Sequence, residues 1–116
     1  MKRVASHLIG VDQGDLVLFS DYENGGAMWT GRGARQRLVP VQFSQRYRKP
    51  PVVHAAMSLL DIATGPSIRA DVSTRKITEG GFEILFRTWE DSQVARIRVA
   101  WMAIGELPDD EDWELC

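Results

Sequence analysis

Trp89, Glu90 and Asp91 combine residue types that suit the binding of a polar ligand. An indole ring offers an apolar face on which the C–H side of a sugar ring can pack, and neighbouring carboxylates accept hydrogen bonds from hydroxyl groups. Trp89 lies at odd parity after the alternating run that ends at Phe86, so its side chain is predicted to point away from the core. It could also serve a contact between subunits or ordinary packing. Glu90 and Asp91 could act as an acid–base pair or form a polar turn.

Other patterns of catalysis or metal binding are missing. The two histidines, His7 and His54, lie far apart and lack the spacing of a zinc site. The single cysteine, Cys116, is the last residue, so no internal disulfide can form and a terminal thiol is poorly placed as a nucleophile. Gly31-Arg32-Gly33 is a lone GxG pattern with no helix after it, which predicts a loop turn. We therefore expect no enzymatic activity, no metal and no cofactor.

The charges are unevenly distributed along the 116 residues. The net charge is −2, which argues against a nucleic-acid binder. Residues 106–116 hold six acids and no base, which leaves residues 1–105 with ten acids, fourteen bases and a net charge of +4. We expect a domain over residues 1–105 and an acidic tail over 106–116, which could dock on a basic partner or stay solvated. Residues 24–60 hold six bases and no acid, and form either an anion-binding patch or solvated charges.

The first ten residues do not resemble a signal peptide, because Lys2 and Arg3 are followed by only a broken apolar stretch. No apolar run reaches the roughly 18 residues that would span a bilayer. Synthesis in the cytoplasm is the default expectation, and a protein carried on a particle or released to act outside the cell would have the same features.

The periodicity of the apolar residues is that of β-strands. In residues 82–88, Phe82, Ile84 and Phe86 share one face, and residues 94–104 alternate in the same way. Glycine and proline pairs separate the apolar runs, as turns between strands do. Six short strands with regular turns predict an all-β antiparallel sandwich or barrel. The expected strands are 16–19, 38–43, 51–60 (with Val53, Ala55, Met57 and Leu59 on one face), 67–73, 82–88 and 94–104.

An ordered set of short motifs resembles the H-type lectin domain, the family of the snail agglutinins and the discoidin C-terminal domain. The set spans residues 39–105, with Gly14 and Gly26-x-x-Trp29 upstream. Its elements are Val41-x-Phe43, Tyr47-x-x-Pro50-Pro51, Leu60-Asp61 with Ile68-Arg69, Thr78-x-x-Gly81-Phe82, Thr88-Trp89 and Val99-x-Trp101-x-Ala103-Ile104. The resemblance implies a six-stranded antiparallel β-sandwich and non-enzymatic binding of glycans of the N-acetylgalactosamine, galactose or other cell-surface type. It also implies a homotrimer whose sugar sites lie between subunits.

The same resemblance implies a site built from the first loop, the arginine of the L-D…R segment and the T-W turn. Arg69 would donate a forked pair of hydrogen bonds and Trp89 would stack on the sugar ring. The remaining residues implied are Gly26, with Asp21 or Glu23 replacing an acid that the family places at Gly26, and Glu90 and Asp91 as acceptors. The chain departs from the snail agglutinins at Glu90, where they have histidine, and at Ala95, where they have an aromatic residue.

A second interpretation keeps the fold without a working sugar site. Domains that resemble H-type lectins also occur in phage-like proteins, so the chain could be a structural or assembly module of a particle or fibre. Trp89 and Arg69 would then lie at contacts between subunits. Binding to glycans would separate the two interpretations.

Overall fold

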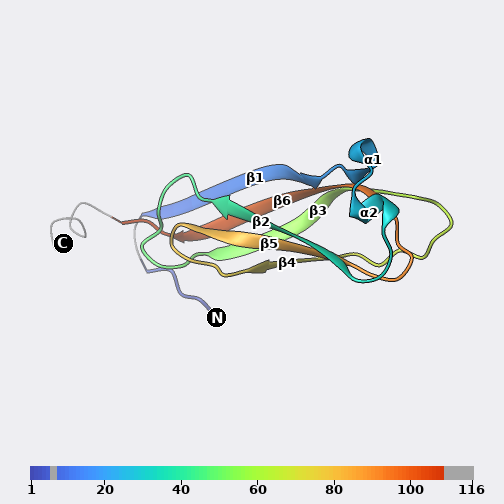
Figure 1. The fold of residues 1–116 in the computed structure, drawn as a ribbon. Helices are drawn as coiled ribbons and strands as arrows, with labels where there is room; N and C mark the ends of the chain where they lie inside the picture. Colours follow the sequence, from blue (N-terminus) through green and yellow to red (C-terminus); the bar gives the residue numbers. More distant parts are fainter. Residues whose placement is uncertain (6–7, 109–116) are drawn as a thin grey trace.

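The computed structural model describes residues 1–5 and 8–108 and is all-β, with two three-stranded antiparallel sheets (Figure 1). One sheet has the order β1-β6-β3 and the other the order β2-β5-β4. Two single-turn helices lie in the connection between the first two strands. The elements are β1 (Ile9–Phe19), α1 (Asp21–Asn24), α2 (Ala27–Thr30), β2 (Arg35–Gln42), β3 (Val52–Ile62), β4 (Asp71–Arg75), β5 (Gly81–Thr88) and β6 (Val94–Glu106).

Side chains from the two sheets meet in one core. Phe82 of β5 lies against Trp101 of β6 with ring centroids 5.4 Å apart, and Phe86 of β5 lies against Phe19 of β1 at 5.2 Å. The alternation expected in β5 and β6 is confirmed, because the predicted inward residues of both strands are buried. The inner faces of the sheets therefore pack against each other, as the sandwich prediction requires.

Three strand predictions need correction. β1 begins at Ile9 rather than Leu16. One of its early inward positions is Gly14, where any side chain would overlap the Trp101 ring. The first half of the strand therefore lacks the apolar alternation by which it could have been predicted. A β-bulge between Met57 and Leu59 shifts the register of β3. Leu59 is thus paired with Arg98 on the outer face, away from the face that it was predicted to share.

The remaining correction concerns β4, which runs over Asp71–Arg75 instead of 67–73. Side-chain hydrogen bonds to the turn after β5 occupy the backbone of residues 67–69 and take the place of strand pairing. The helices α1 and α2 were not predicted, because each spans only four residues and cannot show a 3.6-residue pattern. Neither single turn, within the part of the chain that the structure describes, could cross a membrane.

The fold extends past the predicted domain boundary at residue 105. Glu106 belongs to β6, is buried, and accepts a hydrogen bond from the backbone N–H of Ala5 at 3.0 Å. Leu107 packs against the core. Two residues assigned to the acidic tail are thus part of the sandwich. The rest of the predicted tail, residues 109–116 with Cys116, lies outside the described residues, as does His7.

Strand pairing gathers the three segments of the predicted site at one end of the molecule. The pairs Phe19–Ile97, Ile62–Val94 and Arg35–Thr88 lie at this end of β1, β3 and β5. The connections that leave there are residues 20–34, 63–70 and 89–93, which we call the loop end. Figure 1 shows α1 and α2 at this end, opposite the chain termini.

Candidate functional site

Hydrogen bonds join the three segments of the loop end to one another. Ser92 is the centre of one set: its hydroxyl donates to the carbonyl of Ser67 at 2.9 Å and accepts from the N–H of Arg69 at 2.8 Å. The Thr88 hydroxyl donates to the Arg69 carbonyl. Because Ser92 and Thr88 are buried, these bonds lie partly out of water and fix the segment 67–69 against the turn that carries Trp89.

Arg35, at the start of β2, joins the first loop to the same turn. Its guanidinium donates to five backbone carbonyls, which matches its full set of N–H donors. The acceptors are Gly33 at 3.0 Å, Ala27 and Met28 at 3.2 Å each, Glu90 at 3.4 Å and Ser92 at 2.8 Å. Burial lowers the pKa of Arg35 below its ordinary value, and the guanidinium stays charged.

Asp21, predicted to contact a ligand, has a structural role in the first loop. The residue is 3% exposed, and its carboxylate accepts a hydrogen bond from the N–H of Met28 at 2.9 Å and lies 3.6 Å from the guanidinium of Arg37. Gly26 packs directly on this carboxylate, since a Cβ there would collide with it. Asp21 and Gly26 therefore lie together, with the carboxylate beneath the glycine and out of reach of a ligand.

Trp89, Glu90 and Asp91 are exposed in the turn between β5 and β6. The Trp89 side chain is 40% exposed, which agrees with its predicted outward orientation. In the described part of the chain, its ring has no aromatic or cationic partner, and neither carboxylate has a hydrogen-bond partner. Glu90 adopts a left-handed backbone with φ of 60°, which turns the chain sharply after the tryptophan.

Arg69 is bonded through its backbone to residues at both ends of this turn. Its backbone N–H and carbonyl are held by Ser92 and Thr88, whereas its guanidinium makes only one long hydrogen bond, to the Ile68 carbonyl at 3.5 Å. The side chain is half-buried, and most of its N–H donors have no partner among the described residues. Arg69 thus combines a fixed backbone with a guanidinium available to a ligand.

A hollow of about 410 Å³ lies beside Trp89 and is lined by Ala34, Arg35, Gln36, Arg87, Thr88 and Trp89. We call it the Trp89 hollow. Arg87, one of the lining residues, is paired with Asp71 at 2.9 Å. The sequence did not single out Gln36, Arg87 or Arg35 for this end, although Arg35 belongs to the basic segment 24–60.

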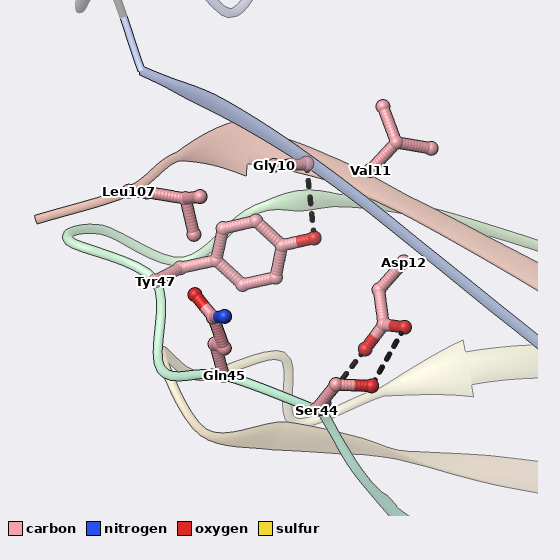
Figure 2. A pocket seen from close by; sticks show the side chains of 7 residues that line it. All are labelled: Gly10, Val11, Asp12, Ser44, Gln45, Tyr47 and Leu107. Carbon is pink, nitrogen blue, oxygen red and sulfur yellow. Dashed lines mark hydrogen bonds between the residues drawn. The ribbon is translucent and has the colours of Figure 1, made fainter.

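A second hollow, of about 170 Å³, lies at the opposite end of the sandwich, and Figure 2 shows its lining. Its polar groups are already paired: Asp12 accepts from the N–H and hydroxyl of Ser44 at 2.7 and 3.0 Å, and the Tyr47 hydroxyl donates to the Gly10 carbonyl at 3.1 Å. Burial first, and the charge of Asp12 second, raise the pKa of Tyr47 above 10.0. These contacts close the sandwich between β1 and the chain before β3. No residue predicted for the site lies here.

Metal binding finds no support among residues 1–5 and 8–108, where no three His, Cys, Asp or Glu side chains come together as a metal site requires. His54 lies exposed on β3. The groups that remain available at the loop end are thus an aromatic face, carboxylates and a guanidinium.

Known proteins resemble this chain in both sequence and fold. A protein of Fuscovulum blasticum, described as ATP synthase subunits region ORF 7, is 43% identical over 107 residues, which cover 92% of this chain and 93% of that protein. Discoidin-1 of Dictyostelium discoideum is 32% identical over 78 residues, or 66% of this chain, and the match spans 31% of the discoidin.

The solved structure of recombinant discoidin II of Dictyostelium discoideum superposes with a TM-score of 0.74 at 21% identity, over 94% of this chain and 41% of that one. The fold is therefore shared. The sequence profile of the H-type lectin domain matches residues 38–104, more than half of the chain. The chain belongs to the H-type lectin domain family.

Proposed function

We propose that this protein is a non-enzymatic carbohydrate-binding protein whose sugar site is the loop end around Trp89. The observation that carries the proposal is the exposed indole of Trp89, which has no partner among the described residues and lies on a turn fixed by partly buried hydrogen bonds. An indole face so placed can pack on the C–H side of a sugar ring without first giving up another partner. A rigid platform also lowers the entropy lost on binding.

The polar groups around the ring suit sugar hydroxyls. Glu90 and Asp91 provide acceptors in the same turn, and Arg69 provides N–H donors on the segment that is bonded to it; these groups have no other partner within residues 1–5 and 8–108, apart from the long bond from Arg69 to the Ile68 carbonyl. Arg69 donates a forked pair of hydrogen bonds to sugar or acetamido oxygens in this proposal. We infer sugars of the N-acetylgalactosamine or galactose type from the family resemblance. Glu90, where the chain departs from the snail agglutinins, is exposed and is the residue that would change this preference, whereas Ala95, the other departure, is buried.

We also propose a homotrimer that forms through the outer face of the β1-β6-β3 sheet. Register places Val11, Ile104 and Val52 in one row across this face, and all three are exposed. Such a row of neighbouring apolar side chains is typical of a contact surface. Two rows further along, Ala100 pairs with Ala56, in a shallow hollow of about 540 Å³ into which a second copy could fit closely.

Two measurements test the proposal together. Sedimentation equilibrium gives the mass of the purified protein, and a printed glycan array tests the fluorescently labelled protein against several hundred sugars. Single sites of this shallow kind are expected to bind with Kd from about 10 μM to 1 mM, and three sites on one trimer raise the avidity on a dense surface. A trimer with hits among galactose-type glycans supports the proposal. A trimer without hits favours the assembly module of a phage-like particle instead.

A further inference from the structure

The Trp89 hollow contains polar groups that the sandwich itself does not use. The amide of Gln36 makes no hydrogen bond within the described residues, and the indole N–H of Trp89 makes none either. The Nε and Nη2 of Arg87 donate hydrogen bonds to the Asp71 carboxylate at 3.3 and 2.9 Å. Its Nη1 has no partner in the described part of the chain. An amide, an indole N–H and a guanidinium N–H thus border one hollow.

The other two polar walls of the hollow are already occupied. The N–H groups of Arg35 donate to five backbone carbonyls, and the Thr88 hydroxyl donates to the Arg69 carbonyl. These walls are therefore rigid and offer no strong donor to a ligand. Gln36 and Arg87 come from neighbouring strands and face outward in register, since they are partners across β2 and β5, the strands that lie side by side in Figure 1.

The position of the hollow differs from that of the groups expected to hold the first sugar. Arg69 belongs to the connection between β3 and β4, whereas the hollow opens on the outer side of β2 and β5. Trp89 borders the hollow and carries the turn with Glu90 and Asp91. Arg69, Glu90 and Asp91 do not line the hollow, so a ligand that contacts both sets of groups must extend beyond it.

We propose that the Trp89 hollow is a second saccharide subsite, so that the ligand is an oligosaccharide of at least two units. Gln36 and Arg87 are its specificity-determining residues. This inference rests on the proposed carbohydrate site and deepens it. The planar amide of Gln36 both donates and accepts, and the Nη1 of Arg87 adds a donor on the neighbouring strand, so donor and acceptor groups lie close together as adjacent sugar hydroxyls require. The volume of about 410 Å³ lies within the range of small-ligand sites.

The test compares glycans that share a terminal sugar and differ in length. The array is printed with galactose and N-acetylgalactosamine as monosaccharides and as the ends of di- and trisaccharides. The wild-type protein is compared with Gln36→Ala and with the matched control Gln42→Ala, which removes an exposed amide from the same outer face of β2 at its other end. Thermal unfolding of each variant establishes that it is folded.

The wild-type protein and Gln42→Ala are expected to prefer the longer glycans by about tenfold. Gln36→Ala should bind the longer glycans about fivefold more weakly than the wild-type protein and should bind the monosaccharides with unchanged affinity. Arg87→Lys keeps the charge beside Asp71 but loses the planar fork, and should show the same selective loss. Equal binding of short and long glycans by the wild-type protein, or an equal loss on both by Gln36→Ala, overturns the subsite alone. Absence of all binding overturns the proposed carbohydrate function and the subsite with it.

Discussion

Replacing Arg35 by methionine removes the hydrogen bonds that join the first loop to the Trp89 turn while keeping a long apolar stem. Two of the five bonds, to Met28 and Ser92, are partly buried, and the other three are exposed. With about 1 to 1.5 kcal/mol for each partly buried bond and about 0.5 for each exposed one, the free energy of unfolding should fall by about 3.5 to 4.5 kcal/mol. Arg35→Lys should lower the free energy of unfolding by about half as much, because three donors on one nitrogen cannot reach the carbonyls of both segments.

Urea denaturation followed by circular dichroism measures the change, at one fixed protein concentration because association shifts apparent stability. The matched control is Arg32→Met, in the same loop, where the guanidinium makes no hydrogen bond or ion pair with the described residues. It should change the free energy of unfolding by less than about 0.5 kcal/mol. If Arg35→Met lowers the free energy of unfolding no more than Arg32→Met does, the hydrogen bonds from Arg35 to the five carbonyls do not hold the loop end together.

Three further predictions concern other parts of the molecule. Gly26→Ala places a methyl group on the buried Asp21 carboxylate and should cost about 1 to 3 kcal/mol in the same denaturation assay, whereas equal stability would mean that the loop relaxes freely. The raised pKa of Tyr47 means that the folded protein keeps a proton which the unfolded chain loses as the pH rises above 10.0. The free energy of unfolding should therefore fall as the pH rises above that value, and Tyr47→Phe should lessen that slope. Ile104→Asp puts a charge in the exposed apolar row of β6 and should reduce the sedimentation mass from trimer to monomer with the circular dichroism spectrum unchanged; an unchanged mass would place the contact on another face.

The fold could be predicted wherever alternation was uninterrupted. Residues of β5 and β6 alternate between core and outer positions, and the structure follows that pattern. β1 was largely missed because the Trp101 ring fills the space in which Gly14 would otherwise carry a side chain, and no local pattern reveals a partner 87 positions away. The β-bulge at Ser58 is equally hidden, since a register shift depends on the strand opposite.

The candidate site was predictable in its segments and less so in its individual side chains. Motif spacing indicated the first loop, Arg69 and the Trp89 turn, and hydrogen bonds do bring these segments together. Residue type could not tell that the Asp21 carboxylate is buried under Gly26. Nor could it single out Arg35 among the six bases of residues 24–60, because its role depends on carbonyls from two distant segments.

Binding of the strongest array glycan to Trp89→Ala tests the central claim most directly. Isothermal titration compares this variant with the wild-type protein and with Trp89→Phe, which keeps an aromatic face, after sedimentation has established the same mass for all three. Loss of the indole should weaken binding by about 30-fold, equivalent to about 2 kcal/mol, and Trp89→Phe should keep most of the affinity. Affinity of Trp89→Ala within about twofold of the wild-type value would contradict a sugar site built on this tryptophan.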